Sequence, residues 1–230
     1  MDESCDCAGR EGVSSRARWI ARENRNGWLS SFEVAGSGKI RMTISAVLLA
    51  GGKSIRMGQD KATMLFRGES LWKNRLGVLR RLRPKEIFIS ARTDPLWRPV
   101  DVEFVPDVQP SSGPLSGIAG TFARVTSDYL LVLAIDTPFI TEEYLRDICA
   151  RTQPGCGVVP MIENRAEPLA AIYPRNANAD FEAALAGSDF SLQPLIRKLI
   201  ALGTLQPIHV SRNDIALFRN LNEPKDLTDR

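Results

Sequence analysis

The sequence predicts a doubly wound α/β fold with a mostly parallel sheet and one antiparallel insertion. From residue 43 onward, short apolar runs alternate with amphipathic stretches, as strands and helices do when they follow one another. The run Tyr129–Ile135 is apolar on both faces, which is typical of a strand in the middle of a parallel sheet. A polar stretch at 163–166 lies between two later apolar runs and predicts a hairpin, which supplies the antiparallel part.

The first half of the pattern predicts three strands and two helices. The strand at 43–50 runs into two adjacent glycines, and the helix at 70–82 carries its leucines near one face. Pro84 ends this helix, and Pro114 suits the first turn of the next helix, where its missing N–H costs nothing. The expected elements are strands at 43–50, 86–90 and 102–105, and helices at 70–82 and 114–125.

The second half continues the alternation. Thr141 precedes two glutamates, so its hydroxyl can cap a helix whose positive end the carboxylates favour. The expected elements are strands at 129–135, 157–161, 168–173 and 208–210, and helices starting at 141, 177, 192 and 224. Ligands of doubly wound sheets bind at the carboxyl ends of the strands, so residues that directly follow strands are the candidates for a site.

Size and composition indicate a globular protein with one ordinary domain. The chain has 230 residues, of which 43% are apolar and 25% charged, with a net charge of +3. Its basic residues are spread along the chain, and no apolar run approaches the ~18 residues of a membrane span, so we expect neither nucleic acid nor membrane as a partner. The four cysteines do not have the spacing of a disulfide framework, which favours a reducing cytoplasm.

The first 41 residues differ from the rest of the chain. They lack a periodic apolar pattern, and they contain no apolar segment with the cleavage site of a secretory signal. Met42 stands directly before the first convincing strand. We therefore expect 1–41 to be a disordered extension, or an artefact of an upstream start codon, and 42–230 to be the functional domain.

A cationic glycine turn follows the first strand. Gly51 and Gly52 allow a close approach of backbone N–H groups to phosphate, and Lys53, Arg56 and Lys61 add positive charge. The turn lacks the first glycine of a Walker A loop and the spacing of a dinucleotide-binding turn. A plain strand-to-helix connection is the alternative, but the combination of glycines and cations favours phosphate binding.

Two aspartates also follow predicted strands. Asp136 ends the most hydrophobic strand, and because Thr141 is the better helix cap, Asp136 is available to hold Mg²⁺, which prefers hard oxygen ligands. Asp107 follows the strand at 102–105 and would project from the same edge of the sheet. Its alternative role is that of an ordinary turn residue.

The chain lacks the residues of acyl-transfer chemistry. Its single histidine, His209, lies late in the chain, where we expect a surface strand residue with no catalytic role. The attack of a phosphate monoester on the α-phosphate of a nucleoside triphosphate needs no general base, because the second pKa of such a phosphate is ~6. The protein need only align the reactants and stabilise charge.

These motifs resemble those of the molybdenum cofactor guanylyltransferase family. The run LAGGKSIRMGQDKA at 49–62 is similar to the family's LAGGxSxRMGxDK signature, and GPLSG at 113–117 to its GPLxG segment. The DTP turn at 136–138, the PLAAIY strand at 168–173 and the FRNLNEPKDL run at 218–227 resemble further family segments. The family has a Rossmann-like fold of the nucleotidyltransferase type.

The resemblance implies a reaction and a set of binding residues. It implies transfer of GMP from GTP to Mo-molybdopterin, with a Mg²⁺ ion held by Asp136. The residues it places on the nucleotide are Leu49, Ala50, Gly51, Gly52, Arg56, Lys61 and Asp107, with Arg56, Lys61 and Asp136 as the catalytic set. Asn220 and Asn222 align with asparagines near the pterin. The resemblance further implies a mostly monomeric enzyme that meets a molybdenum-inserting protein and apo-molybdoenzymes.

Two departures and several alternatives remain. Ser90 stands where relatives often have an asparagine that contacts the base, and Glu223 replaces a threonine of the closing motif. A cytidylyltransferase that uses CTP, or a transferase acting on a sugar phosphate or lactate phosphate, is the nearest alternative, although GPLSG resembles the guanylyl branch. A nucleotide sensor without catalytic activity is an alternative of another class.

Overall fold

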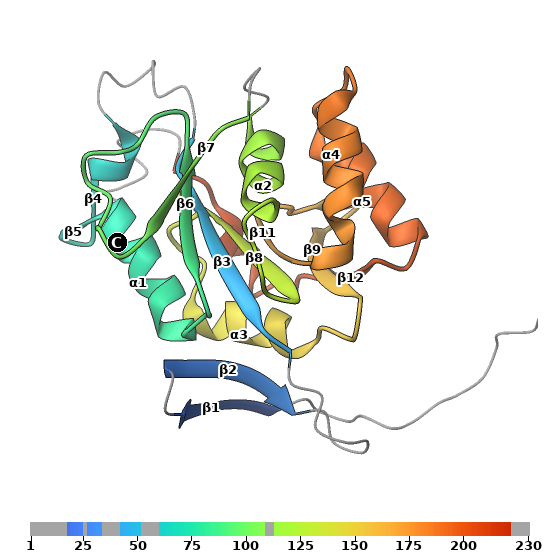
Figure 1. Cartoon of the computed structure of the whole chain (residues 1–230), viewed down its shortest axis with the longest axis horizontal. Helices are drawn as coiled ribbons and strands as arrows, with labels where there is room; N and C mark the ends of the chain where they lie inside the picture. The colour runs from blue at the N-terminus through green and yellow to red at the C-terminus, as the bar shows by residue number, and fades with distance from the viewer. Residues whose placement is uncertain (1–17, 25–26, 34–41, 52–59, 109–112, 222–230) are drawn as a thin grey trace, which may run out of the picture.

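The protein forms one main sheet between two layers of helices (Figure 1). The computed structural model describes residues 18–24, 27–33, 42–51, 60–108 and 113–221, with side chains from residue 42 onward. Within these residues the main sheet has eight strands, and the predicted doubly wound α/β class is confirmed.

Four parallel strands make up the centre of the sheet. They are β3 (Ile44–Leu49), β6 (Ile87–Ala91), β7 (Glu103–Pro106) and β8 (Tyr129–Ala134), and they lie in the order β8-β3-β6-β7. Every residue of β3 and β8 is buried, as expected of strands covered on both faces. The chain leaves β3 toward β6 on one side and returns to β8 on the other. The strand order therefore reverses at the boundary between β3 and β8.

The other half of the sheet contains the predicted antiparallel insertion. Its strands are β9 (Gly157–Ile162), β10 (Arg165–Ala166), β11 (Ala170–Pro174) and β12 (Leu205–His209). The expected hairpin joins β9 to β10, while β11 lies between β8 and β9 and runs antiparallel to both. Because β11 runs in the opposite direction, its first residues lie at the carboxyl end of β8.

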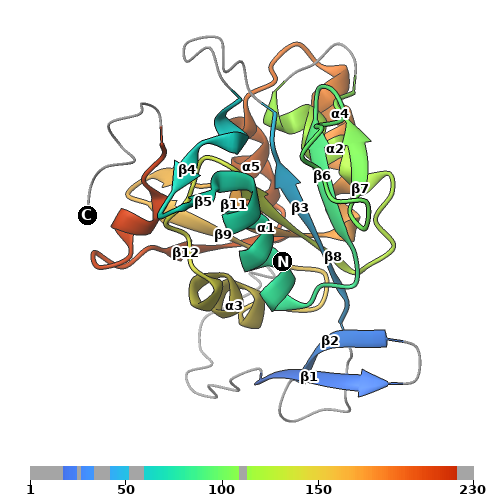
Figure 2. The ribbon, with the colours of Figure 1, turned by 90° about the vertical axis from the view of Figure 1, so that its left-hand side faces the viewer.

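Helices cover both faces of the sheet and create two hydrophobic cores (Figures 1 and 2). One face carries α1 (Leu71–Leu82) and α3 (Glu142–Ala150), and the other carries α2 (Pro114–Phe122), α4 (Asn178–Ala186) and α5 (Leu192–Ala201). The predicted caps are present, since the Thr141 hydroxyl accepts from the backbone N–H of Tyr144 and Pro114 begins α2.

Several short elements were not predicted. They are the 3-10 turns η2 (Lys61–Thr63), η3 (Arg175–Ala177) and η4 (Ile215–Phe218), and the two-residue strands β4 (Leu65–Phe66) and β5 (Glu69–Ser70). The β4–β5 turn places Arg67 at φ 52° and Gly68 at φ 81°. The helix expected at 224–229 lies outside the described residues.

An antiparallel hairpin precedes the main sheet. It consists of β1 (Arg18–Asn24) and β2 (Gly27–Glu33), and β1 lies beside α3 at the amino end of the parallel strands (Figures 1 and 2). These strands fall within the segment 1–41, where the sequence pattern gave no expectation of secondary structure, so they are elements that the sequence analysis missed.

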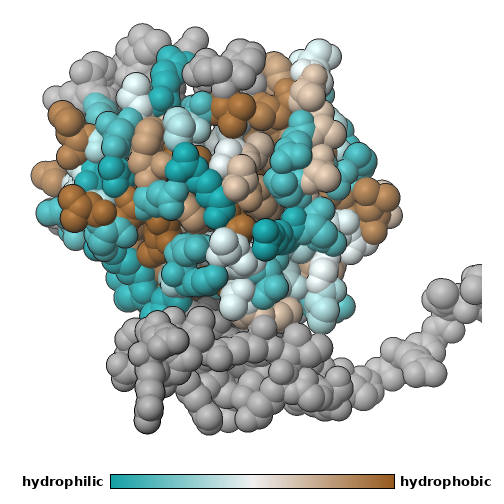
Figure 3. All heavy atoms as spheres, in the orientation of Figure 1, coloured by the Kyte–Doolittle hydropathy of each residue, from teal (hydrophilic) through white to brown (hydrophobic). Residues whose placement is uncertain are grey.

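Hydrophilic and hydrophobic residues are interspersed over the face of the molecule that Figure 3 shows. Of the large exposed apolar side chains, Leu65 lies in β4, whereas Leu96 and Val100 lie in the loop between β6 and β7. None of the helices in the described part of the chain combines the length and apolarity that crossing a membrane requires.

Candidate active site

The predicted site residues that the structure describes gather where the parallel strands end. Leu49 is the last residue of β3, Asp107 follows β7, and Asp136 follows β8 by two residues. This edge is the upper one in Figure 1, opposite the β1–β2 hairpin. It includes the boundary between β3 and β8, where doubly wound sheets bind their ligands.

Lys61 and Asp136 meet at this edge. The Lys61 Nζ lies 3.6 Å from Oδ2 of Asp136, and their side chains are 19% and 33% exposed. An ion pair of this exposure contributes less than about 1 kcal/mol to stability. The pair therefore contributes little to folding. Its importance is that it brings together a cation that follows β3 and a carboxylate that follows β8, at the boundary (the switch point) between these two strands.

The residue before Lys61 fixes the turn η2, which begins at Lys61. Asp60 caps the turn, with its Oδ1 accepting from the Ala62 N–H at 3.0 Å. Its other carboxylate oxygen accepts from Nε1 of Trp97 at 2.8 Å, and Trp97 stacks on Trp72 of α1 at 5.3 Å between ring centroids. The start of η2 is thus tied to the loop after β6 and, through the stacked rings, to α1.

The loop after β8 fixes the backbone of Asp136. The Ile135 N–H donates to the Leu49 carbonyl at 3.0 Å, and the Thr137 hydroxyl donates to the Ala134 carbonyl at 2.9 Å. The Asp136 carbonyl in turn accepts from the Leu221 N–H at 2.9 Å. Because Thr141 caps α3, the Asp136 carboxylate is not used as the helix cap, as the sequence predicted.

Asp107 lies beside Gly51, the first glycine of the cationic turn. Its carboxylate is partly buried beside Gly51, where a Cβ would lie 3.6 Å from Asp107 Oδ2. The Asp107 N–H donates to the Ala91 carbonyl at 3.1 Å, and the Ser90 hydroxyl lies 3.4 Å from Oδ1. Ser90 is 1% exposed, so it contacts Asp107 from within the core.

The second glycine of GPLSG has a packing role that the motif alone did not reveal. A Cβ at Gly117 would lie 2.8 Å from the Ser90 hydroxyl and 3.0 Å from Leu49 Cδ2. Gly117 therefore lets α2 pack closely against the ends of β3 and β6. The same Ser90 hydroxyl is the one that lies 3.4 Å from Asp107 Oδ1.

Other expected residues of the turn are described only in part. Leu49 is buried, Ala50 is half-buried with its N–H bonded to the Ser90 carbonyl at 2.8 Å, and Gly51 is exposed. Gly52 and Arg56 lie outside the described residues, as does Lys53.

The C-terminal segment crosses the loop that carries Asp136. Beyond the Leu221–Asp136 hydrogen bond, Phe218 packs edge-on against Tyr144, and the Arg219 guanidinium lies 4.9 Å from the Phe139 ring centroid. Exposed Asn220 is thereby held next to the site, whereas Asn222 and Glu223 lie outside the described residues.

The structure also adds a residue that the sequence analysis did not single out. Arg75 of α1 is 3% exposed and donates to backbone carbonyls of the Asp136 loop. The available signal was its spacing, since a charged residue four positions after Leu71 and four before Leu79 falls on the apolar face of the helix.

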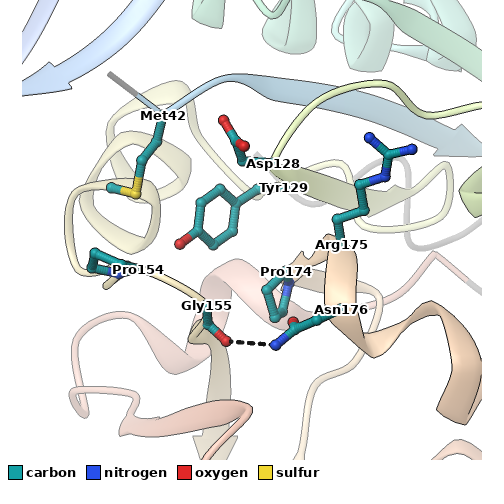
Figure 4. A pocket seen from close by; sticks show the side chains of 8 residues that line it. All are labelled: Met42, Asp128, Tyr129, Pro154, Gly155, Pro174, Arg175 and Asn176. Atoms are coloured by element: carbon teal, nitrogen blue, oxygen red, sulfur yellow. Dashed lines mark hydrogen bonds between the residues drawn. The ribbon is translucent and has the colours of Figure 1, made fainter. Parts of the chain in front are cut away.

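Two other features lie apart from this edge. His209 is exposed at the end of β12, as expected of a surface strand residue. A cavity of about 310 Å³ lies at the amino end of β8, where Asn176 donates to the Gly155 carbonyl at 3.3 Å (Figure 4). Neither feature reaches the residues that follow the parallel strands.

Comparison with known proteins places this architecture in a family. Residues 46–204 match the model of the MobA-like NTP transferase domain. The chain belongs to this family. The match spans β3 through α5, and so it includes Lys61, Asp107 and Asp136.

Two relatives are similar over nearly their whole length. A probable molybdenum cofactor guanylyltransferase of Opitutus terrae is 32% identical over 80% of this chain and 92% of its own. A molybdenum cofactor guanylyltransferase of Syntrophotalea carbinolica is 33% identical over 79% and 88%. The MobA-like chain described here is therefore a nucleotidyltransferase.

A solved structure supports the fold. Molybdopterin-guanine dinucleotide biosynthesis protein A from Archaeoglobus fulgidus superposes with a TM-score of 0.62 at 23% identity, covering 80% of this chain and 94% of its own. At that identity the likeness concerns the fold, and it agrees with the predicted nucleotidyltransferase type.

Proposed function

We propose that this chain transfers GMP from GTP to Mo-molybdopterin, forming molybdopterin guanine dinucleotide and pyrophosphate. The observation that carries the proposal is the approach of Lys61 Nζ to within 3.6 Å of Asp136 Oδ2 at the switch point of the sheet. Relatives about one-third identical over most of their length carry the name of this activity, which favours GTP over CTP.

In the proposed reaction the chain aligns two phosphates and stabilises charge. A phosphate oxygen of the acceptor attacks the α-phosphorus of GTP, the bond to the bridging oxygen breaks, and pyrophosphate leaves with the electron pair. The acceptor phosphate is already anionic near neutral pH, since its second pKa is ~6, so no side chain need remove a proton. Lys61 and Arg56 are the proposed cations on the triphosphate.

The residues present fit a Mg²⁺ ion held jointly with the nucleotide. Asp136 offers a partly exposed carboxylate, and within the described residues no group of three or more His, Cys, Asp or Glu side chains forms a closed metal site. Mg²⁺ usually takes one or two carboxylates and completes its shell with water and phosphate oxygens. When bound it would neutralise the charge that develops on the phosphates.

The cationic turn is the proposed nucleotide subsite. Leu49, Ala50, Gly51 and Gly52 would contact the guanine nucleotide, with Asp107 on the far side of the turn. Supporting this, Gly51 is exposed and lies so close to Asp107 that a side chain there would fill the space between them.

We further propose the cellular setting. Cys149 and Cys156 are free thiols, which fits the reducing cytoplasm. There a mostly monomeric enzyme would meet a molybdenum-inserting protein and apo-molybdoenzymes, with neither nucleic acid nor membrane as a partner.

A nucleotide panel tests the function. Pyrophosphate release is measured with each nucleoside triphosphate in the presence of Mg²⁺ and Mo-molybdopterin, and we expect GTP to be the preferred donor. Faster turnover with CTP would replace the guanylyl assignment with a cytidylyl one. A protein that binds GTP yet releases no pyrophosphate with any acceptor would be a sensor.

Asp136→Asn tests the site within the same assay. It removes the carboxylate charge at nearly constant volume, and we expect turnover to fall by about 100-fold or more with the fold retained. Asp101→Asn is the matched control, because Asp101 pairs with Arg80 on the surface before β7, at the opposite edge of the sheet. Equal losses in both variants would contradict the assigned site.

A further inference from the structure

Arg75 is a buried cation inside the hydrophobic face of α1. Its residue exposure is 3%, and its neighbours on the helix face, Leu71 and Leu79, are fully buried. Burying a charged group is costly unless hydrogen bonds replace its water. Burial lowers the pKa of Arg75 to about 10, with the charges of Arg81 and Arg67 adding to the effect, so it remains a cation at neutral pH.

Two of the four replacement hydrogen bonds go to one loop, and the other two go to the neighbouring Asn74. Nη1 of Arg75 donates to the carbonyls of Thr137 and Ile140 at 2.9 and 2.7 Å. Nε and Nη2 donate to the Oδ1 of Asn74 at 3.1 and 2.6 Å. Within the described part of the chain Arg75 makes no ion pair with a carboxylate, so its buried charge is compensated by amide oxygens.

The two carbonyls bracket the turn that directly follows Asp136. Thr137 is the next residue, and Ile140 ends the turn one residue before the cap of α3. The backbone on the other side of Asp136 is held by the strand contact from Ile135 to Leu49. Arg75 thus joins α1 to the half of this loop that follows Asp136.

We propose that Arg75 is a positioning residue that holds the Asp136 loop in the conformation that presents its carboxylate to the divalent cation. Arg75 does not touch the reacting atoms, and it acts through the backbone of the loop. The proposal rests on the proposed role of Asp136 as a Mg²⁺ ligand. The proposal predicts that loss of Arg75 weakens the binding of the divalent cation.

Arg146 provides a matched control for a purely structural role. It donates to Glu142 Oε1 at 2.8 Å and to the Arg81 carbonyl at 2.7 Å, so it also ties α3 to α1 through a carbonyl. These two hydrogen bonds go to the first turn of α3 and to the last turn of α1, not to the carbonyls of the Asp136 loop. Arg146→Met should therefore lower the free energy of unfolding without changing cation binding.

The experiment compares Arg75→Met, Arg75→Lys and Arg146→Met in the full chain. Mn²⁺ binding in the presence of GTP is followed by electron paramagnetic resonance, and the Mg²⁺ concentration for half-maximal pyrophosphate release is measured alongside. For Arg75→Met we expect both constants to rise about tenfold, because two carbonyls lose charged donors. Arg75→Lys keeps the charge and one donor group, so its constants should lie between those of the wild type and of Arg75→Met.

The outcomes separate the possibilities. Unchanged Mn²⁺ and Mg²⁺ constants in a folded Arg75→Met, or an equal rise in Arg146→Met, would overturn the positioning role. If Arg75→Met does not fold, Arg75→Lys decides, and wild-type constants in that variant would overturn it. Absence of transfer by the wild type with every acceptor would instead refute the proposed function, while Mn²⁺ binding would still report on the loop.

Discussion

Asp60 illustrates how one residue prepares another at this site. One carboxylate oxygen caps η2, and the other accepts from Trp97, so the turn that carries Lys61 is fixed from two directions. A hydrogen bond to a carboxylate contributes about 1.5–3 kcal/mol, more than the exposed ion pair between Lys61 and Asp136 would. The orientation of Lys61 therefore depends more on Asp60 and Trp97 than on Asp136.

Trp97→Phe tests this dependence. Phenylalanine keeps a ring to stack on Trp72 but loses the Nε1 donor, so η2 should loosen while the packing survives. We expect the KM for GTP to rise about three- to tenfold with a smaller change in kcat. Steady-state kinetics give both constants, and Trp72→Phe, which keeps the Trp97–Asp60 bond, serves as the control. A KM that changes equally in both variants would show that stacking matters more than the hydrogen bond.

Single residues were predictable where one position had one clear role. The interpretation of Asp136 as a helix cap was rejected because Thr141 was the better candidate, and in the structure Thr141 caps α3. Arg75 was missed because the leucines around it already accounted for the helix. Its carbonyl partners are more than 60 positions away in the chain, at separations of 62 and 65, so no local pattern could reveal them.

Long elements were predicted well, and very short ones were not. The strands and helices that enclose the two cores have enough residues to show a period, and each was found within a few residues of its observed bounds. β4 and β5 have two residues each, and their turn uses Arg67 and Gly68 rather than a typical hairpin pair. β12 begins earlier than expected because Pro207 is tolerated in a strand that, among the described strands, pairs with β9 alone.

The packing of α2 gives a prediction at the level of an element. In Gly117→Ala the new Cβ would meet the Ser90 hydroxyl at 2.8 Å, so Ser90 must move or α2 must retreat from the strand ends. This strain outweighs the gain in helix propensity, and we expect a loss of about 1–2 kcal/mol in the free energy of unfolding. Urea denaturation followed by circular dichroism measures it.

Gly77→Ala is the matched control in the other helical layer. Its nearest neighbour would be the flexible Arg81 guanidinium at 3.5 Å, an ordinary contact. Helix propensity then dominates, and we expect a gain of about 0.5–1 kcal/mol. Stabilisation by both substitutions would mean that the contact between Gly117 and Ser90 does not limit the packing of α2.

The whole molecule combines two hydrophobic cores with a polar site at the carboxyl ends of the strands. Apolar side chains fill both helical layers, so polar groups that follow the strands are fixed by a rigid frame. The location of the site at the carboxyl ends of the strands was predictable, because it follows from the alternation of strands and helices. The β1–β2 hairpin was not, because it lies before the alternating pattern and outside the stretch that matches the family.

Buried groups that resist ionisation predict how stability depends on pH. Burial raises the pKa of Cys149 to about 12 and that of Tyr129 to about 12, above their ordinary values of 9.0 and 10.0. Burial also raises the pKa of Tyr173. Above pH 9 the unfolded chain therefore releases protons that the folded chain retains, so the free energy of unfolding falls as the pH rises.

We expect full stability from these groups below pH 9 and a progressive loss from pH 9 to 12, by up to about 1.4 kcal/mol per pH unit for each group that ionises only when unfolded. Urea denaturation at a series of alkaline pH values measures the slope. Cys149→Ala removes one of these protons, so its slope above pH 9 should be shallower than that of the wild type even if its stability at neutral pH is lower. Parallel slopes would mean that the thiol ionises as easily in the folded protein as in the unfolded chain, which a buried sulfur on the inner face of α3 should not allow.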